Sequence, residues 1–382
     1  MFPKLRFKKF DGDWTAVTLE SLAEVERGKF SVRPRNDPRY FGGEMPFIQT
    51  GDVTGSDVYL KGYTQTLNDD GIRVSKVFPA DTILITIAAN IGDTTITQYP
   101  VACPDSVVAI QPKQDKVNTI FLKNVIDLQK DNLDSQATQN AQKNINLQVL
   151  KPLKLIVPSK EEQNKIASFL SAVDEKISQL TQKLELLSQY KQGMMQKLFS
   201  QQIRFKADDG SEFGEWKSVF LGDISKPQQW KTISSSELTE IGYPVFGANG
   251  YIGFYPKYNH INETIAVTCR GATCGEVTLV KAKSYITGNA MSIDEINENE
   301  HSTLYIYYAL CFRGFKDVIS GSAQPQIVGN AIRKVTFQIP CLEEQTKIAN
   351  FLSSIDQKIE VVAQQIEQAK QWKKGLLQNM FV

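Results

Sequence analysis

The chain has 382 residues, of which 41% are hydrophobic and 22% charged, and its formal net charge is +1. This length predicts two or three domains of ordinary globular composition, and the near-zero charge argues against a protein that coats nucleic acid. The sequence contains no apolar run of about 18 residues and no apolar leader, so we expect neither a membrane span nor a secretory signal. Five cysteines without framework spacing suit a reducing compartment, and two histidines offer no zinc pattern.

The first 157 residues combine strand and helix patterns. Strands are predicted at Asp81–Ala88 and Ser106–Pro112, and residues 118–133 have the apolar spacing of a helix. Gly92 is expected in a turn between two strand-like runs. We therefore expect a mixed α and β domain, called head 1 below, over residues 1–157.

A basic segment precedes these elements. Between residues 27 and 39 a single aspartate accompanies five cations, Arg27, Lys29, Arg33, Arg35 and Arg39, and two prolines favour a loop over a helix. Such a charge run can be plain solvated surface. Arginine also forks onto guanine edges and phosphates, so this loop is a candidate nucleic-acid contact.

Residues 158–202 predict one long helix. Apolar side chains recur at alternating steps of four and three, which is the seam of a coiled coil: Ile166, Leu170, Val173, Ile177, Leu180 and Leu184. The seam is otherwise apolar, but Lys191 occupies one of its positions. The alternative is a helix that packs only on its own head.

The second half of the chain repeats the first. Residues 340–381 align with 158–199 without a gap at an offset of 182, and 20 of 42 positions are identical. The second seam consists of Ile348, Leu352, Ile355, Ile359, Val362 and Ile366, with Lys373 equivalent to Lys191. An internal repeat of this kind indicates one structural unit used twice.

A second head, head 2, is predicted over residues 203–339, before the C-terminal helix of 340–382. Thr264–Thr268 and Glu276–Val280 have strand patterns, Gly275 lies in a turn between them, and residues 301–319 have helical spacing. The order head, helix, head, helix predicts an α+β protein with pseudo-two-fold symmetry, which suits the dyad of duplex DNA.

Polar loops in both heads are candidate base contacts, because amide and guanidinium groups pair with base edges. Head 1 offers Gln49 and Thr50 besides Lys29, Arg33, Arg35 and Arg39, and head 2 offers Asn249, Tyr251 and Arg270. Matched loops before each long helix add Gln142, Lys143, Gln324 and Gln326.

Several motifs occur twice. Both long helices open with Pro-x-x-Glu-Glu-Gln-x-Lys-Ile-Ala-x-Phe-Leu, continue with Asp-x-Lys-Ile and end with Gly-x-x-Gln-x-x-Phe. Residues 214–223 read Gly-Glu-Trp-x-x-x-x-Leu-Gly-Asp, whereas head 1 departs from this with Gly12-Asp13-Trp14 and Leu19-Glu20-Ser21. Over essentially its whole length the chain resembles the specificity subunits of type I restriction-modification systems.

The resemblance implies a fold and a function. The heads would be target recognition domains that each recognise half of a bipartite DNA site, and the two helices would pack antiparallel as a spacer. Lys191 and Lys373 would then extend toward solvent or an acidic group of a partner. Two methyltransferase subunits and restriction/translocase subunits would assemble around the chain in the cytoplasm, and they rather than this chain would bind S-adenosylmethionine, ATP and Mg²⁺.

No catalytic motif accompanies these features. The sequence lacks a Gly-x-x-x-x-Gly-Lys-Ser/Thr loop, a His-Glu-x-x-His pair and an Asp/Asn-Pro-Pro-aromatic tetrapeptide, and Gly247–Gly250 is interpreted as a head loop. We therefore expect a non-catalytic DNA-recognition subunit. Two alternatives remain: the specificity subunit of another restriction arrangement with a fused methylase-nuclease partner, and a coiled-coil adaptor that binds no nucleic acid.

Overall fold

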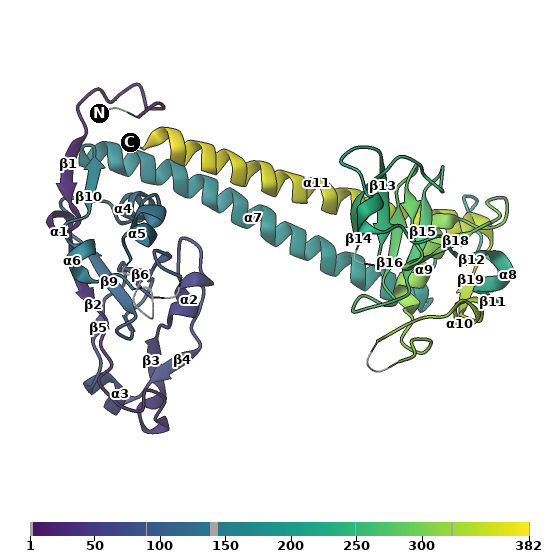
Figure 1. Cartoon of the computed structure of the whole chain (residues 1–382), viewed down its shortest axis with the longest axis horizontal. Coiled ribbons are helices and arrows are strands. Elements are labelled where there is room, and N and C mark those ends of the chain that lie inside the picture. Colours follow the sequence, from purple (N-terminus) through teal and green to yellow (C-terminus); the bar gives the residue numbers. More distant parts are fainter. Residues whose placement is uncertain (1–2, 89, 138–143, 249, 322–323, 382) are drawn as a thin grey trace. The chain divides into compact units, whose positions relative to one another are not determined.

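The computed structural model of the chain describes residues 3–381 except 89, 138–143, 249 and 322–323 (Figure 1). It divides into two compact units, residues 1–181 with 364–382 (unit 1) and residues 182–363 (unit 2). Each unit therefore contains one head together with part of each long helix. Among the described residues, no helix is both long and apolar enough to cross a membrane.

Head 1 contains two sheets, whose strands pair mostly antiparallel, and one separate antiparallel pair of strands. The first sheet has the order β2 (Ala23–Arg27), β9 (Val107–Pro112), β6 (Ile83–Thr86), β7 (Thr94–Ile96). The second has the order β4 (Gln65–Leu67), β3 (Phe41–Phe47), β8 (Val101–Ala102), β5 (Val77–Phe78), and β1 (Thr15–Thr18) pairs with β10 (Lys154–Val157). The helices are α1 (Leu19–Leu22), α2 (Thr50–Thr54), α3 (Asp69–Arg73), α4 (Thr119–Asp127), α5 (Lys130–Gln136) and α6 (Leu147–Leu150), with a 3-10 turn at Pro38–Tyr40.

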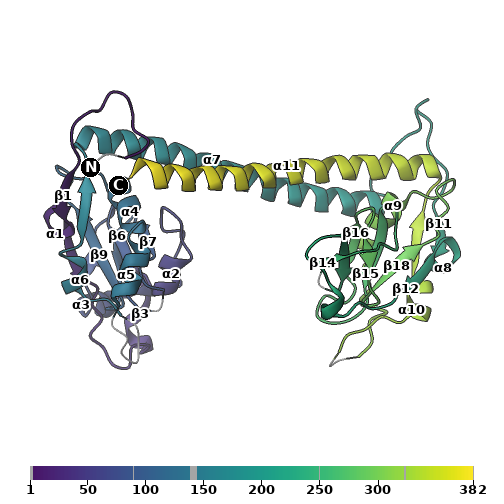
Figure 2. The ribbon, with the colours of Figure 1, turned by 45° about the horizontal axis from the view of Figure 1, so that its top comes forward.

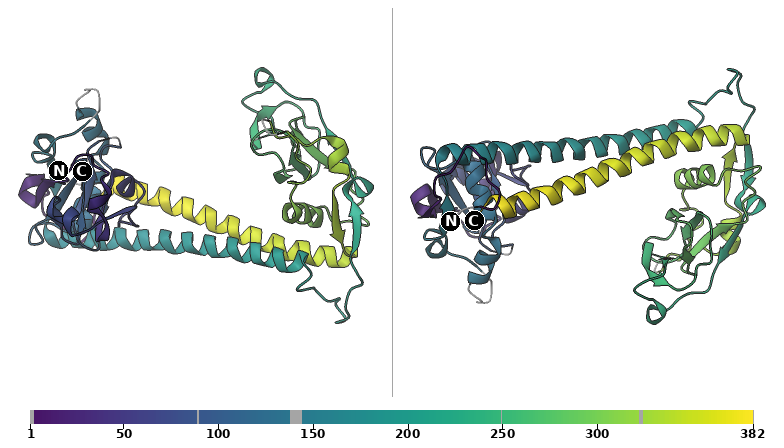
Figure 3. Two further views of the ribbon diagram at one scale, coloured as in Figure 1. Left: turned by 90° about the horizontal axis from the view of Figure 1, so that it is seen from below. Right: turned by 90° about the horizontal axis from the view of Figure 1, so that it is seen from above.

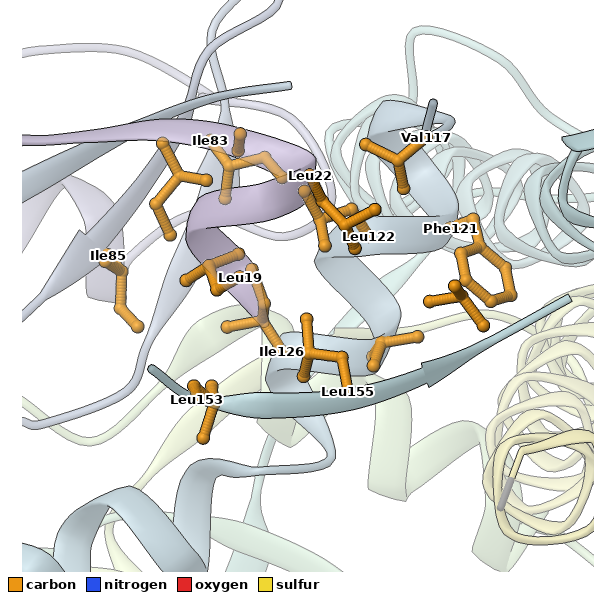
Figure 4. Close-up of a cluster of buried hydrophobic side chains, with 14 of the residues drawn as sticks. Leu19, Leu22, Ile83, Ile85, Val117, Phe121, Leu122, Ile126, Leu153 and Leu155 are labelled. Atoms are coloured by element: carbon orange, nitrogen blue, oxygen red, sulfur yellow. The ribbon is translucent and has the colours of Figure 1, made fainter. Parts of the chain in front are cut away.

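Strand β6 has core on both of its faces, which explains its unbroken apolar sequence. Ile83 and Ile85 join one hydrophobic cluster and Leu84 joins another, as strand alternation requires. Figure 4 shows Ile83 and Ile85 on the same side as Leu22 and Leu19 of α1, and α4 adds Leu122 and Ile126 to the same cluster. The predicted strands over Asp81–Ala88 and Ser106–Pro112 are thereby confirmed as β6 and β9.

The predicted helix over residues 118–133 is two helices instead of one. Asn118 caps α4 by accepting a hydrogen bond from the Phe121 N–H, and α4 ends at Asp127. The chain then bends at Leu128, which is exposed, so that Leu133 of α5 can enter the core. The apolar spacing spans both helices because both contribute to the same cluster.

Head 2 repeats the architecture of head 1. Its main sheet has the order β12 (Lys226–Gln229), β18 (Ala290–Asp294), β15 (Thr264–Thr268), β16 (Val277–Val280), and the second sheet β14 (Gly250–Tyr255), β13 (Tyr243–Gly247), β17 (Tyr285–Ile286). β11 (Lys217–Phe220) pairs with β19 (Thr336–Ile339). The helices are α8 (Leu221–Ile224), α9 (Thr303–Arg313) and α10 (Gly329–Arg333), with a 3-10 turn at Ser235–Glu237.

The strands predicted for head 2 are present, and its predicted helix is shorter than expected. Strands β15 and β16 confirm the two predicted strands. Helix α9 is shorter than the predicted 301–319, because Gly314 has a φ of +65° and its N–H bonds back to the Leu310 carbonyl at 2.9 Å, which ends the helix.

The two long helices are α7 (Lys160–Phe199) and α11 (Leu342–Met380), and they lie side by side within each unit (Figure 2). In unit 1, Ile166 near the start of α7 shares a core with Leu376 and Met380 near the end of α11. In unit 2, Leu198 near the end of α7 shares a core with Ile348 near the start of α11. The helices are therefore antiparallel, as the views in Figure 3 also show.

The positions of the predicted seam are shielded from solvent along both helices. Nine of the twelve positions are buried, namely Ile166, Leu170, Val173, Leu180, Ile348, Leu352, Ile355, Val362 and Ile366, and three are partly buried, namely Ile177, Leu184 and Ile359. Residues such as Ile166 and Leu170 also contact the adjoining head. The alternative of helices that pack only on their own heads is wrong, because each helix also packs along the other.

The lysines that interrupt the seam contact the opposite helix. In unit 1, Lys373 Nζ of α11 lies 2.5 Å from Asp174 Oδ1 of α7. In unit 2, Lys191 Nζ of α7 lies 2.6 Å from Asp356 Oδ1 of α11. These two contacts are called the Lys–Asp pairs below. The expectation that these lysines extend to solvent or to a partner is wrong, because each has a carboxylate within the helix pair.

The repeated Glu-Glu-Gln motif joins the start of each long helix to the N-terminal segment of a head. Glu162 is 1% exposed and accepts from Arg6 Nε and Nη2, both at 2.7 Å, while Nη2 also donates to the Gly12 carbonyl. The equivalent Glu344 accepts from Arg204 at 3.0 and 2.7 Å. A buried carboxylate needs such partners, so the motif is explained by structure.

Candidate nucleic-acid interface

In head 2, two separate segments pair at the end of the main sheet. The hairpin between β15 and β16 meets the segment before α10: Arg270 and Gln326 form an antiparallel bridge, and the Ile327 N–H donates to the Cys269 carbonyl at 3.0 Å. Arg270, Gln324 and Gln326 all have exposed side chains. The structure thus brings together three residues that the sequence predicted as contacts from positions more than 50 residues apart.

The hairpin depends on a glycine turn and on a third segment. Gly275 has a φ of +93°, as expected for a turn position, and its N–H donates to the Thr268 carbonyl at 2.8 Å. The carbonyl of Ala248, after β13, accepts from Thr268 Oγ1 at 3.2 Å and from Thr273 Oγ1 at 2.7 Å. The β13–β14 turn is therefore attached to the same hairpin, and the predicted Asn249 in it lies outside the described residues.

Tyr251 follows that turn at the start of β14. Its hydroxyl accepts a hydrogen bond from the Lys281 backbone N–H at 3.1 Å, and its ring packs edge-on against Phe246 with centroids 5.5 Å apart. The side chain is nevertheless 46% exposed. A fixed, half-exposed aromatic face is suited to apolar or stacking contact rather than to base-edge hydrogen bonding.

Sequence reasoning missed Gln229, at the end of β12. Its Nε2 donates to the Gly288 carbonyl at 3.0 Å and lies 3.0 Å from Cys269 Sγ, beside the hairpin. A polar residue that closes a strand is a weak signal by itself, because many strands end in this way. Only the pairing of β12 with β18 brings this side chain to the candidate interface.

Head 1 builds the same edge with different side chains. The bridge between Ala88 and Asn144 stands at the positions equivalent to Arg270 and Gln326, and the Ile145 N–H donates to the Ile87 carbonyl at 3.0 Å. The predicted Gln142 and Lys143 lie just before this bridge, outside the described residues. The hairpin also contains Asn90, whose Nδ2 lies 3.5 Å from Thr54 Oγ1 of α2, and Gly92, whose φ of +87° confirms the predicted turn.

The predicted Gln49 and Thr50 lie at the start of α2, next to this hairpin. Gln49 is the N-cap of α2: its side chain accepts from the Asp52 backbone and its own N–H donates to Asp52 Oδ2 at 2.8 Å. Its Nε2 donates to Gln65 Oε1 at 2.9 Å. Both ends of the amide are thus occupied, so base recognition by Gln49 requires it to exchange these bonds, whereas Thr50 is half-exposed.

The basic segment is a loop, as predicted, between Arg27 at the end of β2 and the 3-10 turn that contains Arg39, and its arginines have internal partners. Arg35 Nη2 lies 2.8 Å from Asp105 Oδ2, and Arg39 Nη2 lies 2.6 Å from Asp37 Oδ2. The Arg33 guanidinium donates to the Val32 carbonyl at 2.7 Å. Hydrogen bonds from Arg39 hold the pKa of Asp37 below its usual range. Ion pairs of surface arginines contribute little to stability, so a phosphate can replace the carboxylate.

Asp105 connects the basic loop to the hairpin edge of head 1. The residue after it, Ser106, accepts from the Ile87 N–H at 3.2 Å, and Arg27 Nε donates to the Asp105 carbonyl at 2.5 Å. Arg35 therefore lies at the same end of the main sheet as the hairpin. The side chain of Lys29 is exposed, and its carbonyl accepts from Ser75 Oγ at 2.8 Å.

The described part of the chain offers no metal centre, and its most deeply buried cysteine is not reactive. Among those residues, no three His, Cys, Asp or Glu side chains are grouped to hold a metal ion. Burial raises the pKa of Cys103 to about 12, which keeps it a thiol at neutral pH. A cavity of about 940 Å³ in head 1 is lined by β3, α3 and Tyr99, and none of its lining residues is a predicted contact residue.

A family model described as the type I restriction modification DNA specificity domain matches residues 11–189 and 214–371. The chain belongs to this family. The resemblance that its repeated motifs suggested is thereby confirmed.

Individual members of the family match along nearly the whole chain. A putative type I restriction enzyme MjaX specificity subunit of Methanocaldococcus jannaschii is 26% identical, covering 98% of this chain and 94% of that protein. The EcoprrI specificity subunit of Escherichia coli is 23% identical, covering 90% and 88%.

Solved structures share the fold. The S subunit of a type I restriction-modification system from M. genitalium superposes with a TM-score of 0.69 at 19% identity, covering 100% of this chain and 99% of that one. A chain from a study of type I complex assembly and conformational transition gives 0.58 at 14% identity, covering 98% and 99%. The predicted α+β fold with two long helices is thus the fold of type I specificity subunits.

Proposed function

We propose that the chain is the non-catalytic DNA-recognition subunit of a type I restriction-modification complex, in which each head recognises one half of a bipartite, asymmetric site. The observation that carries this proposal is the loop edge that both heads build from equivalent segments but line differently. Ala88 and Asn144 stand in head 1 where Arg270 and Gln326 stand in head 2. Equivalent positions with different hydrogen-bonding groups suit two unequal half-sites.

The test is to map methylated adenines in DNA of a host that expresses the chain with the modification subunit of its own system. Two half-sites separated by a constant unspecified gap are expected. Arg270→Ala should relax or lose only the half recognised by head 2, by about 1–3 kcal/mol of discrimination or roughly 5- to 150-fold. Lys283→Ala, which removes an exposed cation on the loop between β16 and β17, is a control that should leave both half-sites unchanged.

We propose that two copies of the methyltransferase subunit bind the chain, with restriction/translocase subunits joining them in the cytoplasm. The helices support two copies because exposed aromatics recur at equivalent places: Tyr190 is 51% exposed and Trp372 is 55% exposed. An exposed aromatic on an otherwise polar helix is typical of a protein contact. S-adenosylmethionine, ATP and Mg²⁺ are assigned to those partners.

Two other functions give different results. A specificity subunit with a fused methylase-nuclease partner would bind DNA in the same way, and the neighbouring genes distinguish it. A coiled-coil adaptor would bind no duplex at any ionic strength, whereas the proposed function requires binding that weakens with salt. The basic loop of head 1 favours binding, because the side chains of Lys29, Arg35 and Arg39 are exposed and can exchange their present partners for phosphate.

A further inference from the structure

Two equivalent residues end the first strand of the main sheet in each head. Arg27 is the last residue of β2, and Gln229 is the last residue of β12. An offset of 202 residues relates them, and the same offset relates β1 to β11 and α1 to α8. The strand register agrees, because Arg27 lies opposite Val108 of β9 and Gln229 lies opposite Met291 of β18, the strand equivalent to β9.

A matched turn precedes that neighbouring strand in each head. In head 1 the Val107 N–H donates to the Pro104 carbonyl at 3.1 Å, and in head 2 the Ala290 N–H donates to the Thr287 carbonyl at 3.0 Å. The carbonyl of the third turn residue accepts from the adjacent hairpin at 3.2 Å in both heads. The two turns therefore occupy equivalent places beside the candidate interface of their heads.

Both strand-end side chains bind the second residue of this turn. Arg27 Nε donates to the Asp105 carbonyl at 2.5 Å, and Gln229 Nε2 donates to the Gly288 carbonyl at 3.0 Å. One N–H group thus holds each side chain against the backbone, while both side chains are exposed. Among the residues that the structure describes, neither the Nη groups of Arg27 nor Oε1 of Gln229 has a hydrogen-bond partner. The remaining proton of Gln229 Nε2 faces Cys269 Sγ, a weak acceptor, at 3.0 Å.

The groups that stay available differ in chemistry. The two Nη groups of Arg27 only donate, which suits guanine O6 and N7, whereas the carboxamide of Gln229 accepts and donates, which suits adenine N6 and N7. The neighbouring hairpin position differs in the opposite sense, with Ala88 in head 1 and Arg270 in head 2. Of these two matched positions, each head therefore places its guanidinium at a different one.

We infer that Arg27 and Gln229 are matched specificity-determining residues: Arg27 pairs with a guanine in the half-site of head 1, and Gln229 pairs with an adenine in the half-site of head 2. A side chain that a backbone carbonyl already holds loses less conformational entropy when it binds a base. This inference rests on the proposed DNA-recognition function and names bases that it recognises.

The exchanges Arg27→Gln and Gln229→Arg test the inference, because each head shows that the other's side chain can bind the turn carbonyl. The backbone contact is therefore kept while the base-pairing group changes. Each variant is assembled with the modification subunit of its own system, and duplexes with every base pair of the native site replaced in turn compete for binding. We expect Arg27→Gln to lose a roughly 5- to 150-fold preference for guanine at one position and to prefer adenine there. Gln229→Arg should change one position of the other half-site from adenine to guanine.

A matched control separates base pairing from charge. Lys154→Gln removes an exposed cation of β10, which pairs with β1, and should leave the base preference at every position unchanged. If Arg27 instead contacts a phosphate, Arg27→Gln should weaken binding to all duplexes equally and lower the salt slope by about one. That uniform loss would overturn the inference.

Three other results would also overturn it. These are unchanged base preferences in the exchange variants, effects of both exchanges in the same half-site, and a native half-site of head 1 without a G·C pair. All three leave the proposed function intact, because the native complex still recognises a bipartite site. An unmutated complex that recognises no bipartite site would contradict the proposed function itself.

Discussion

A matched insertion of one heptad in each long helix should lengthen the gap between half-sites. The insertions belong after Leu184 in α7 and after Ala363 in α11, near the boundaries of the two units. Both positions lie between the two Lys–Asp pairs, so each unit keeps its own pair and its own head contacts. Seven residues add about 10 Å at ~1.5 Å per residue, which corresponds to about three base pairs at ~3.4 Å each.

The same insertion also changes the rotational relation between the heads and DNA. Three base pairs turn the duplex by about 100°, since B-DNA completes a turn in about 10.5 base pairs, whereas a heptad leaves the helix face within about 20°. The DNA or the heads must twist to compensate. We therefore expect the new sites to be methylated more slowly than the native sites, with both half-site sequences unchanged.

Methylation mapping of the complex is the assay, and the single insertion after Leu184 is the control. In that control α7 exceeds α11 by two turns, so either Lys191 or Asp174 loses its partner, and we expect loss of activity or a gap that has not grown by the full amount. An active matched variant with the native gap would refute the reasoning that helix length sets the spacing.

Three further predictions concern the heads and their attachment. Arg33→Ala and Arg35→Ala should weaken DNA binding and lower the salt slope by about one per phosphate contact, which titrations at several ionic strengths would detect; an unchanged slope and methylation rate would remove both from the interface. Exchange of residues 1–157 for the first head of another family member should change only the first half-site, and mapped sites altered in both halves would contradict independent heads. Glu344→Ala should cost about 1–3 kcal/mol in urea unfolding because it leaves the Arg204 guanidinium and the Trp216 indole N–H without their acceptor, whereas the exposed Glu343→Ala should cost under about 1 kcal/mol.

The sequence by itself determined the repeat, the long helices and their seam. Heptad spacing is a local property, so positions such as Leu170 and Leu352 could be assigned to the seam from their neighbours alone. The strands around Ile83–Thr86 and Thr264–Thr268 were also predictable from local sequence, because a buried strand is a short apolar run between turn residues. The helix of residues 118–133 was predicted too long, since apolar spacing does not reveal a bend between two helices that share one core.

Only the tertiary structure decided which residues meet. The bridge between Arg270 and Gln326, the pairing of Arg35 with Asp105, and the contact of Lys373 with Asp174 all join positions remote in sequence. A residue's own surroundings in the chain give its chemistry but not its partner, because the partner depends on how sheets and helices close on one another. Lysine in an apolar seam therefore indicated only a costly polar position, and the antiparallel packing of α7 against α11 supplied the aspartate that stabilises it.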